Sequence, residues 1–249
     1  MHVLAFDTST DAMSLAVARD LGPQATVWTR TASGGAQASA TLLPFALELM
    51  QQARLGFADL DAIAFGCGPG AFTGLRTACS VAQGLAFGAQ GLPLGRELPV
   101  LPVDTLLTMA EVARHQQSGA AGFRVLVLLD ARMDEVYSAA YEFDGNLWHQ
   151  SQEHRLDAPE QLAAPALWHG APYRLAGNVF DTMGSRLGSF SGLQRVAVLP
   201  QAAAMLRLAP ALLAAGHAVA PELALPTYIR DKVAQTTQQR LAAKAAARQ

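Results

Sequence analysis

The sequence predicts an α/β protein of two lobes, each built in the order β-β-β-α-β-α. Short apolar runs with strand composition alternate with helical apolar periods in the first half, and the same order returns in the second half. The chain has 249 residues, of which 51% are hydrophobic and 15% are charged, so it can bury two cores of ordinary size. Repetition and composition together therefore indicate the fold class.

The first lobe is expected over residues 1–103. It opens with three short apolar runs bounded by turn residues, which predict strands at His2–Phe6, Ser14–Ala18 and Ala25–Thr29. Apolar residues at helical spacing predict a helix over Ser39–Ala53, in which Pro44 fits only within the first turn. A fourth strand, Ala62–Phe65, leads through a glycine-rich turn into a second helix over Thr73–Ala89.

The second lobe is expected over residues 104–230 and repeats the order less regularly. Its predicted strands are Arg124–Leu129, Glu135–Phe143, Leu147–His154 and Tyr173–Ala176. Pro159–Ala164 is predicted as a short helix and Gln201–Ala215 as an amphipathic one, and the helix over 201–216 is expected to pack back on the first lobe. Residues 231–249 are rich in Ala and Gln and are expected to form a basic, solvated tail.

A short internal match supports duplication. Asp7 at the end of the first strand is followed four residues later by Asp11, and Asp130 at the end of the corresponding later strand is followed four residues later by Asp134. Each pair of acids precedes the next strand. Two copies of β-β-β-α-β-α describe the actin-like ATPase fold, which is related to the ribonuclease H-like fold.

The strand ends are a candidate nucleotide site. In actin-like ATPases such acids hold Mg²⁺ or orient a water, and the N–H groups of the turns bind phosphate. The candidate residues are Asp7, Thr8, Ser9 and Asp130. Phosphate turns usually need glycine so that the backbone can come close, but neither the turn 8–10 nor the turn 131–133 contains one. The sequence therefore favours capping acids and, at most, a degenerate nucleotide site.

A glycine-rich segment, 66–74, joins a predicted strand to the helix Thr73–Ala89. It lacks the spacing of a dinucleotide-binding turn and the lysine of a P-loop, so the favoured interpretation is a tight connection with Thr73 as N-cap. The helix carries a stripe of small residues at spacings of three and four: Gly74, Thr77, Val81, Gly84 and Gly88. Such a stripe permits close packing either within the chain or against a partner, and both alternatives stay open.

Several functional classes are poorly supported. None of the six histidines has another four residues away, and C-x-x-C and G-x-S-x-G motifs are absent, which argues against metal catalysis and serine hydrolysis. The net charge of −2 gives no global reason for direct nucleic-acid binding. Two cysteines, no signal peptide and no long apolar run predict a cytoplasmic protein without a membrane segment.

The run Gly68–Thr77 resembles the signature of the TsaB (YeaZ) family and of its catalytic relative TsaD. Further runs match TsaB in order along the whole chain, at residues 4–10, 82–86, 130–137 and 226–230. One departure is Ala38, six residues before Pro44, where relatives commonly carry histidine. The histidine pair with which TsaD holds its metal is also absent, so no metal site is expected.

The resemblance implies a non-catalytic subunit. TsaD transfers the threonylcarbamoyl group to adenosine 37 of tRNA, a TsaB protein pairs with it, and the ATPase TsaE joins the pair. This chain is then expected to have no activity alone and no cofactor of its own, with ATP or ADP at an interface shared with TsaD. Contact with tRNA would be indirect, and homodimers would use the same surface as TsaD.

The resemblance also implies where the partner binds. The expected interface residues are Ser39, Leu42, Ala46, Leu49, Ala53, Thr73, Gly74, Thr77, Val81, Gly84 and Gly88. Two alternatives from other classes remain: an actin-fold ATP-dependent kinase, which needs phosphate turns, and a glycoprotease-like metal hydrolase, which needs histidine ligands.

Overall fold

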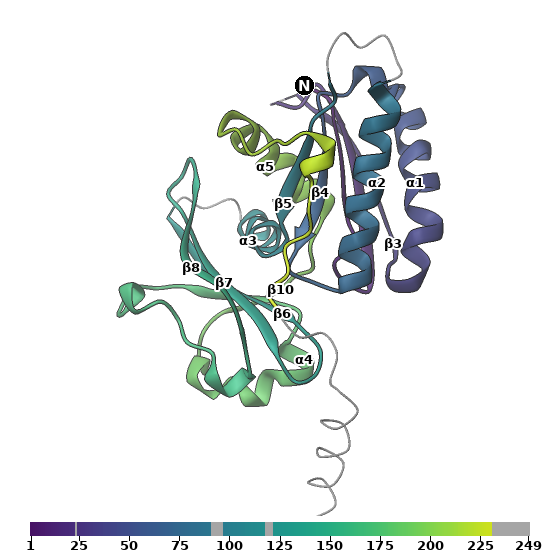
Figure 1. The fold of residues 1–249 in the computed structure, drawn as a ribbon. Helices are drawn as coiled ribbons and strands as arrows, with labels where there is room; N and C mark the ends of the chain where they lie inside the picture. The colour runs from purple at the N-terminus through teal and green to yellow at the C-terminus, as the bar shows by residue number, and fades with distance from the viewer. Residues whose placement is uncertain (23, 91–96, 118–121, 231–249) are drawn as a thin grey trace, which may run out of the picture.

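The computed structural model describes residues 1–22, 24–90, 97–117 and 122–230. These residues form two lobes (Figure 1). A cleft between the lobes is lined by residues of both. The tail expected at 231–249 lies outside the described residues. The chain passes from the first lobe to the second where β5 ends at Asp104 and α3 begins at Thr105.

The first lobe is built on a five-stranded sheet in the order β3-β2-β1-β4-β5. Its strands are β1 (Val3–Asp7), β2 (Ala12–Arg19), β3 (Thr26–Ser33), β4 (Ala62–Gly68) and β5 (Val100–Asp104). The central strand β1 pairs antiparallel with β2 and parallel with β4, and all its residues are buried. A strand buried on both faces needs cover on both sides of the sheet.

Helices supply that cover. Leu4 and Phe6 face a core shared with α1 (Ala38–Ala53) and α2 (Phe72–Gln90). The alternate residues Val3 and Ala5 face a core shared with α5 (Ala202–Ala214). Because successive side chains of a strand point to opposite faces, the two helical layers lie on opposite sides of one sheet. The helix expected over 201–216 thus covers the first sheet although it belongs to the end of the chain (Figure 1).

The second lobe repeats this topology, and the predicted duplicated fold is confirmed. Its sheet has the order β10-β9-β6-β7-β8, in which β6 pairs antiparallel with β7 and parallel with β9. The strands are β6 (Phe123–Asp130), β7 (Val136–Phe143), β8 (Trp148–Asp157), β9 (Arg174–Gly177) and β10 (Arg195–Ala197). The helices are α3 (Thr105–Gln116) and α4 (Phe180–Met183).

Short 3₁₀ turns complete the described chain. They are η1 (Gly35–Gln37), η2 (Phe57–Asp59), η3 (Pro159–Gln161), η4 (Ala166–Trp168), η5 (Gly184–Arg186), η6 (Gly188–Phe190) and η7 (Pro221–Leu223). The short helix predicted over Pro159–Ala164 is therefore only the single turn η3, and the sequence overestimated it.

A buried carboxylate ties helix α3 to both of its neighbours. Glu111 is 2% exposed and accepts hydrogen bonds from Arg207 of α5 (2.7 Å), Arg114 (2.9 Å) and the indole of Trp148 in β8 (3.1 Å). A buried charge is tolerated only when it is paired and hydrogen-bonded in this way. The cluster therefore links α5, which covers the sheet of the first lobe, to α3 and β8 of the second lobe.

Two local predictions were wrong. The first helix begins at Ala38, so Pro44 lies in its second turn; it is exposed there, and water can satisfy the carbonyl that loses its N–H partner. The second helix begins at Phe72, so Thr73 is a helical residue and not the N-cap. The sequence also missed β5, which contains Pro102; a proline is tolerated there because β5 is an edge strand.

Candidate functional site

A cavity of about 370 Å³ lies between the lobes, at the ends of β1 and β6. Its walls come from both duplicated turns and from the start of the glycine-rich connection. The lining residues include Ser9, Asp11, Gly70, Asp130, Arg132 and Asn178. This is the place where the two candidate phosphate turns of the duplicated fold face each other.

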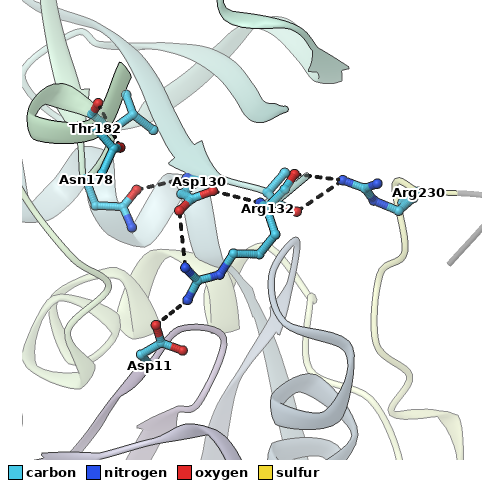
Figure 2. Close-up of polar contacts among 8 residues, drawn as sticks. Asp11, Asp130, Arg132, Asn178, Thr182 and Arg230 are labelled. Atoms are coloured by element: carbon cyan, nitrogen blue, oxygen red, sulfur yellow. Dashed lines mark hydrogen bonds and ion pairs between the residues drawn. The ribbon is translucent and has the colours of Figure 1, made fainter. Parts of the chain in front are cut away.

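Arg132 crosses this cleft. Its guanidinium group pairs with Asp11 of the first lobe and lies 3.5 Å from Asp130 Oδ2 of its own lobe (Figure 2). The backbone N–H of Arg132 donates to Asp130 Oδ1 at 2.7 Å, and the N–H of Asp130 donates to Asn178 Oδ1 at 2.9 Å. The hydrogen bond to Asp11 raises the pKa of Arg132. A side-chain cation thus stands between the acids of the two turns.

The loop that carries Arg132 has an unusual backbone. Arg132, Met133 and Asp134 have φ values of 62°, 55° and 65°, so three consecutive non-glycine residues are left-handed. Each such residue costs about 1–2 kcal/mol, and the surroundings must compensate. Arg230 donates to the carbonyl of Ala131 at 3.1 Å and pairs with Glu135 at 2.7 Å. These contacts hold the loop in place, and Figure 2 shows the hydrogen bonds that Arg230 donates to the loop carbonyls.

Asp7 is enclosed inside the first lobe. The carboxyl group is 0% exposed and accepts hydrogen bonds from the Ser9 N–H at 2.9 Å and the Ser9 hydroxyl at 2.6 Å. A Cβ on Gly66 would lie 1.9 Å from Asp7 Oδ2. Burial raises the pKa of Asp7, against the opposing effect of the Ser9 hydrogen bonds. One carboxylate oxygen, Oδ1, therefore binds the turn, and the enclosed side chain does not line the cleft.

Thr8 serves the packing of α2. Its hydroxyl donates to the carbonyl of Gly74 at 2.6 Å, and a Cβ on Gly74 would lie 1.8 Å from the carbonyl oxygen of Thr8. Gly74 thus allows the helix to begin directly against the β1–β2 turn. Its expected place in the partner interface is wrong, because this glycine is buried within the chain.

The structure separates the residues of the candidate nucleotide site. Ser9 and Asp130 line the cleft, whereas Asp7 and Thr8 do not. The chemistry of Mg²⁺-bound nucleotide does not fit what remains: Arg132 fills the position between the acids, and the left-handed loop has no glycine. Among the described residues, no three His, Cys, Asp or Glu side chains gather as metal ligands.

The two helices expected to meet a partner lie side by side on one face of the first lobe (Figure 1). The interface residues expected on α1 require correction. Leu42, Ala46, Leu49 and Ala53 are at most 2% exposed and form part of the first core. Of the expected α1 residues only Ser39 faces outward. The helix was predicted correctly, but the core-facing stripe was taken for the partner-facing one.

On α2 the expected residues face in different directions. Thr73, Gly84 and Gly88 are exposed, and Thr77 and Val81 are half-buried. Within the part of the chain that the structure describes, no atom lies within 4 Å of a Cβ built on Gly84 or Gly88. The alternative of close internal packing at these two glycines is therefore not supported.

Sequence reasoning missed the apolar residues that do face outward. Leu43 and Leu47 of α1 are 40% and 46% exposed, and Phe87 of α2 is 45% exposed. Leu43 and Leu47 are four residues apart, so they follow the helical period just as the buried stripe does. The sequence therefore already contained a second apolar stripe on this helix. These three side chains and the open glycines form an outward apolar face, called here the α1–α2 face.

Among the described residues no helix is long and apolar enough to cross a membrane.

Comparison with known proteins places this geometry in a family. Residues 34–220 match the family model described as TsaD, tRNA N6-adenosine threonylcarbamoyltransferase. The Escherichia coli tRNA threonylcarbamoyladenosine biosynthesis protein TsaB is 36% identical over 94% of this chain and 96% of its own length. The solved structure of YeaZ from Pseudomonas aeruginosa is 35% identical and superimposes with a TM-score of 0.76, covering 92% of this chain and all of the other. The Haemophilus influenzae TsaB is 40% identical over 55% of this chain and 52% of its own length.

Proposed function

We propose that this chain, which belongs to the TsaB family, acts in tRNA threonylcarbamoyladenosine biosynthesis as the non-catalytic partner of TsaD. The observation that carries the proposal is the α1–α2 face. It exposes Leu43, Leu47 and Phe87 around two open glycines. An apolar face rimmed by polar residues is typical of a protein–protein interface. Helices of the partner can approach closely at Gly84 because no side chain stands there.

The cleft supports the non-catalytic part of this proposal. Arg132 pairs with Asp11 and lies beside Asp130, and Asp7 is enclosed, so the acids of the two turns are paired with a side-chain cation or buried. We therefore expect no cofactor bound by this chain alone. ATP or ADP is proposed at an interface shared with TsaD, with TsaE joining the pair and tRNA contacted through the complex.

Homodimers are proposed to use the same face. The α1–α2 face is nearly free of charge: α1 carries only Glu48, which pairs with Arg30, and α2 carries only Arg76. Such a face has no like-charge repulsion against a second copy. A homodimer would then compete with the TsaD complex, because both require the same surface.

The test is the variant Gly84→Leu. In the free chain, leucine replaces the glycine of an exposed helical position, so we expect unchanged or slightly higher stability, since glycine costs about 1 kcal/mol in a helix. At a close interface the added bulk costs about 1–3 kcal/mol, which weakens affinity roughly 5- to 150-fold. Titration against purified TsaD from the same organism measures the affinity, and thermal unfolding measures the stability.

A matched control exists in the second lobe. Gly188 is also exposed, with no atom within 4 Å of its Cβ among the described residues. Gly188→Leu should leave TsaD binding unchanged. Wild-type affinity for the Gly84→Leu variant would refute the proposed surface.

A further inference from the structure

A third segment lies beside the α1–α2 face. Residues 221–230 run along α2 on the side away from α1 (Figure 1). The carbonyl of Ala224 accepts hydrogen bonds from Gln83 Nε2 at 3.1 Å and from the thiol of Cys79 at 3.2 Å. Further along, the Tyr228 hydroxyl accepts from Arg76 Nε at 3.1 Å. The segment is thus fixed to α2 and runs antiparallel to it over about two turns.

This segment points its large apolar side chains away from the core. Ala224 is buried, whereas the residues on either side of it, Leu223 and Leu225, are 64% and 68% exposed. Both leucines therefore face outward, one at the end of η7 and one just after it. Tyr228 is 44% exposed, and its ring packs against Phe72 with the centroids 5.0 Å apart.

The outward apolar residues of the protein are concentrated here. Half of the large exposed hydrophobic side chains of the described residues lie on α1, α2 or this segment: Leu43, Leu47, Phe87, Leu223, Leu225 and Tyr228. Scattered single apolar residues need no explanation, but a contiguous group marks an interaction site. The glycine-bearing surface of α2 lies between the leucines of α1 and those of the segment.

Charge adds a second feature. Arg76 is the only charged residue of α2 and is exposed at the end near Tyr228. Its guanidinium carbon lies 3.7 Å from the centroid of the Phe72 ring. Within the described residues no carboxylate pairs with it. A fixed cation without an acid at the edge of an apolar face favours a partner with a carboxylate in the opposite position.

We infer that Leu223–Tyr228 forms the second half of the TsaD docking face, and that the partner covers it with an apolar helical surface whose edge places a carboxylate against Arg76. This inference rests on the proposed function. The pairing would then bury three adjacent elements of this chain, with α2 in the middle. The segment follows helix α5 and ends at Arg230, so partner binding would also reach the contacts of Arg230 with the loop at Ala131.

The experiment is the double variant Leu223→Ser/Leu225→Ser, titrated against purified TsaD. Both leucines are more than half exposed, so the midpoint of thermal unfolding should stay within about 2 °C of wild type. We expect affinity for TsaD to fall roughly 10-fold or more, as for truncated apolar anchors at an interface. The control is Leu167→Ser in the second lobe, because Leu167 is also 68% exposed.

A second variant tests the charge. Arg76→Gln keeps a polar side chain but removes the cation, so the affinity of the variant should depend less on salt than that of wild type. A loss of packing alone would leave the salt dependence unchanged, and this outcome would contradict the predicted carboxylate. The variant also keeps the inference testable if the double variant unfolds.

The outcomes separate this inference from the proposed function. If Gly84→Leu weakens TsaD binding and the double serine variant does not, the helices dock but the segment does not, and the inference is overturned. If the double variant loses only self-association, the segment faces a second copy and the inferred occupant is wrong. If neither variant changes TsaD affinity, the proposed docking face fails as well.

Discussion

The two duplicated turns occupy equivalent places in the two lobes but are held by opposite means. The β1–β2 turn encloses Asp7, and the start of α2 covers it through a glycine contact with Thr8. In the β6–β7 turn, 19% of the Asp130 side chain is exposed, and arginine side chains hold the left-handed loop from outside. The topology shared by the two lobes therefore contains a buried turn in the first lobe and a surface turn in the second.

The difference shows why shared topology does not imply shared chemistry. In the first turn the acid stabilises its own backbone, and burial raises its pKa, so it cannot serve as an exposed anion. In the second turn the acid remains at the cleft but is paired with a cation of its own loop. Function in this chain is therefore more readily sought on the α1–α2 face than in the cleft.

The largest effect on stability should come from disrupting the close contact between the start of α2 and the β1–β2 turn. Gly74→Ala places a Cβ 1.8 Å from the Thr8 carbonyl oxygen, so helix and turn must move apart. We expect destabilisation of about 3 kcal/mol or more, because both groups are backbone and cannot rotate away. Denaturant unfolding measures the free energy. Gly84→Ala in the same helix is the control, and it should be neutral or stabilising by up to about 1 kcal/mol.

Sequence predicted the frame well and the orientation of surfaces poorly. The paired acids Asp7 and Asp130 and the repeated element order lead directly to the duplicated fold. The α1 sequence, however, carries two apolar stripes, one through Leu42 and one through Leu43, and spacing alone does not decide which faces the sheet. Burial in the structure decides it. The same ambiguity led to the wrong choice of interface residues on this helix.

Two further features could not be predicted because they contradict local preference. β5 contains Pro102, which usually argues against a strand and is tolerated here by its edge position. Left-handed conformations at Arg132, Met133 and Asp134 have no glycine to indicate them. Contacts from residues distant in sequence, among them Arg230 and Arg186, help to stabilise them. Local signals cannot report a conformation that tertiary contacts impose.

A medium effect on stability is expected from the ionisation of Asp7 in the first turn. The raised pKa of Asp7 means that the folded state binds its proton more tightly than the unfolded state, whose carboxyl titrates near pH 3.9. The resulting stabilisation is complete below that value and is lost as pH rises through the folded pKa. Asp7→Asn removes this titration. The variant should therefore gain stability relative to wild type as pH rises above about 4.

Asp144 of the second lobe serves as the comparison, and the pH dependence of its contribution to stability has the opposite sign. Hydrogen bonds from the Leu147 N–H, His149 and the Asn146 N–H lower the pKa of Asp144 to about 2. Its stabilisation is present above the unfolded value and is lost as pH falls toward 2. Thermal unfolding of both Asn variants between pH 3 and pH 8 measures the two slopes. Equal slopes for Asp7→Asn and Asp144→Asn would contradict the raised pKa of the enclosed Asp7.

The smallest effect should come from the second turn, where two contributions oppose each other. Arg132→Gly removes an ion pair whose side chains are 65% and 79% exposed, and such pairs contribute about 0–1 kcal/mol. Glycine at a φ of 62° relieves a left-handed cost of about 1 kcal/mol but makes the unfolded chain more flexible. We expect a net change in unfolding free energy within about 1 kcal/mol. Arg132→Ala keeps the backbone cost and loses the ion pair, so it should be the less stable of the two variants.

Neither variant should acquire ATP hydrolysis, because Asp7 stays enclosed when Arg132 is gone. ATP turnover by the purified Arg132→Gly chain would show that Arg132 alone keeps the cleft inactive, and the contrast between the two turns would then lose its functional meaning.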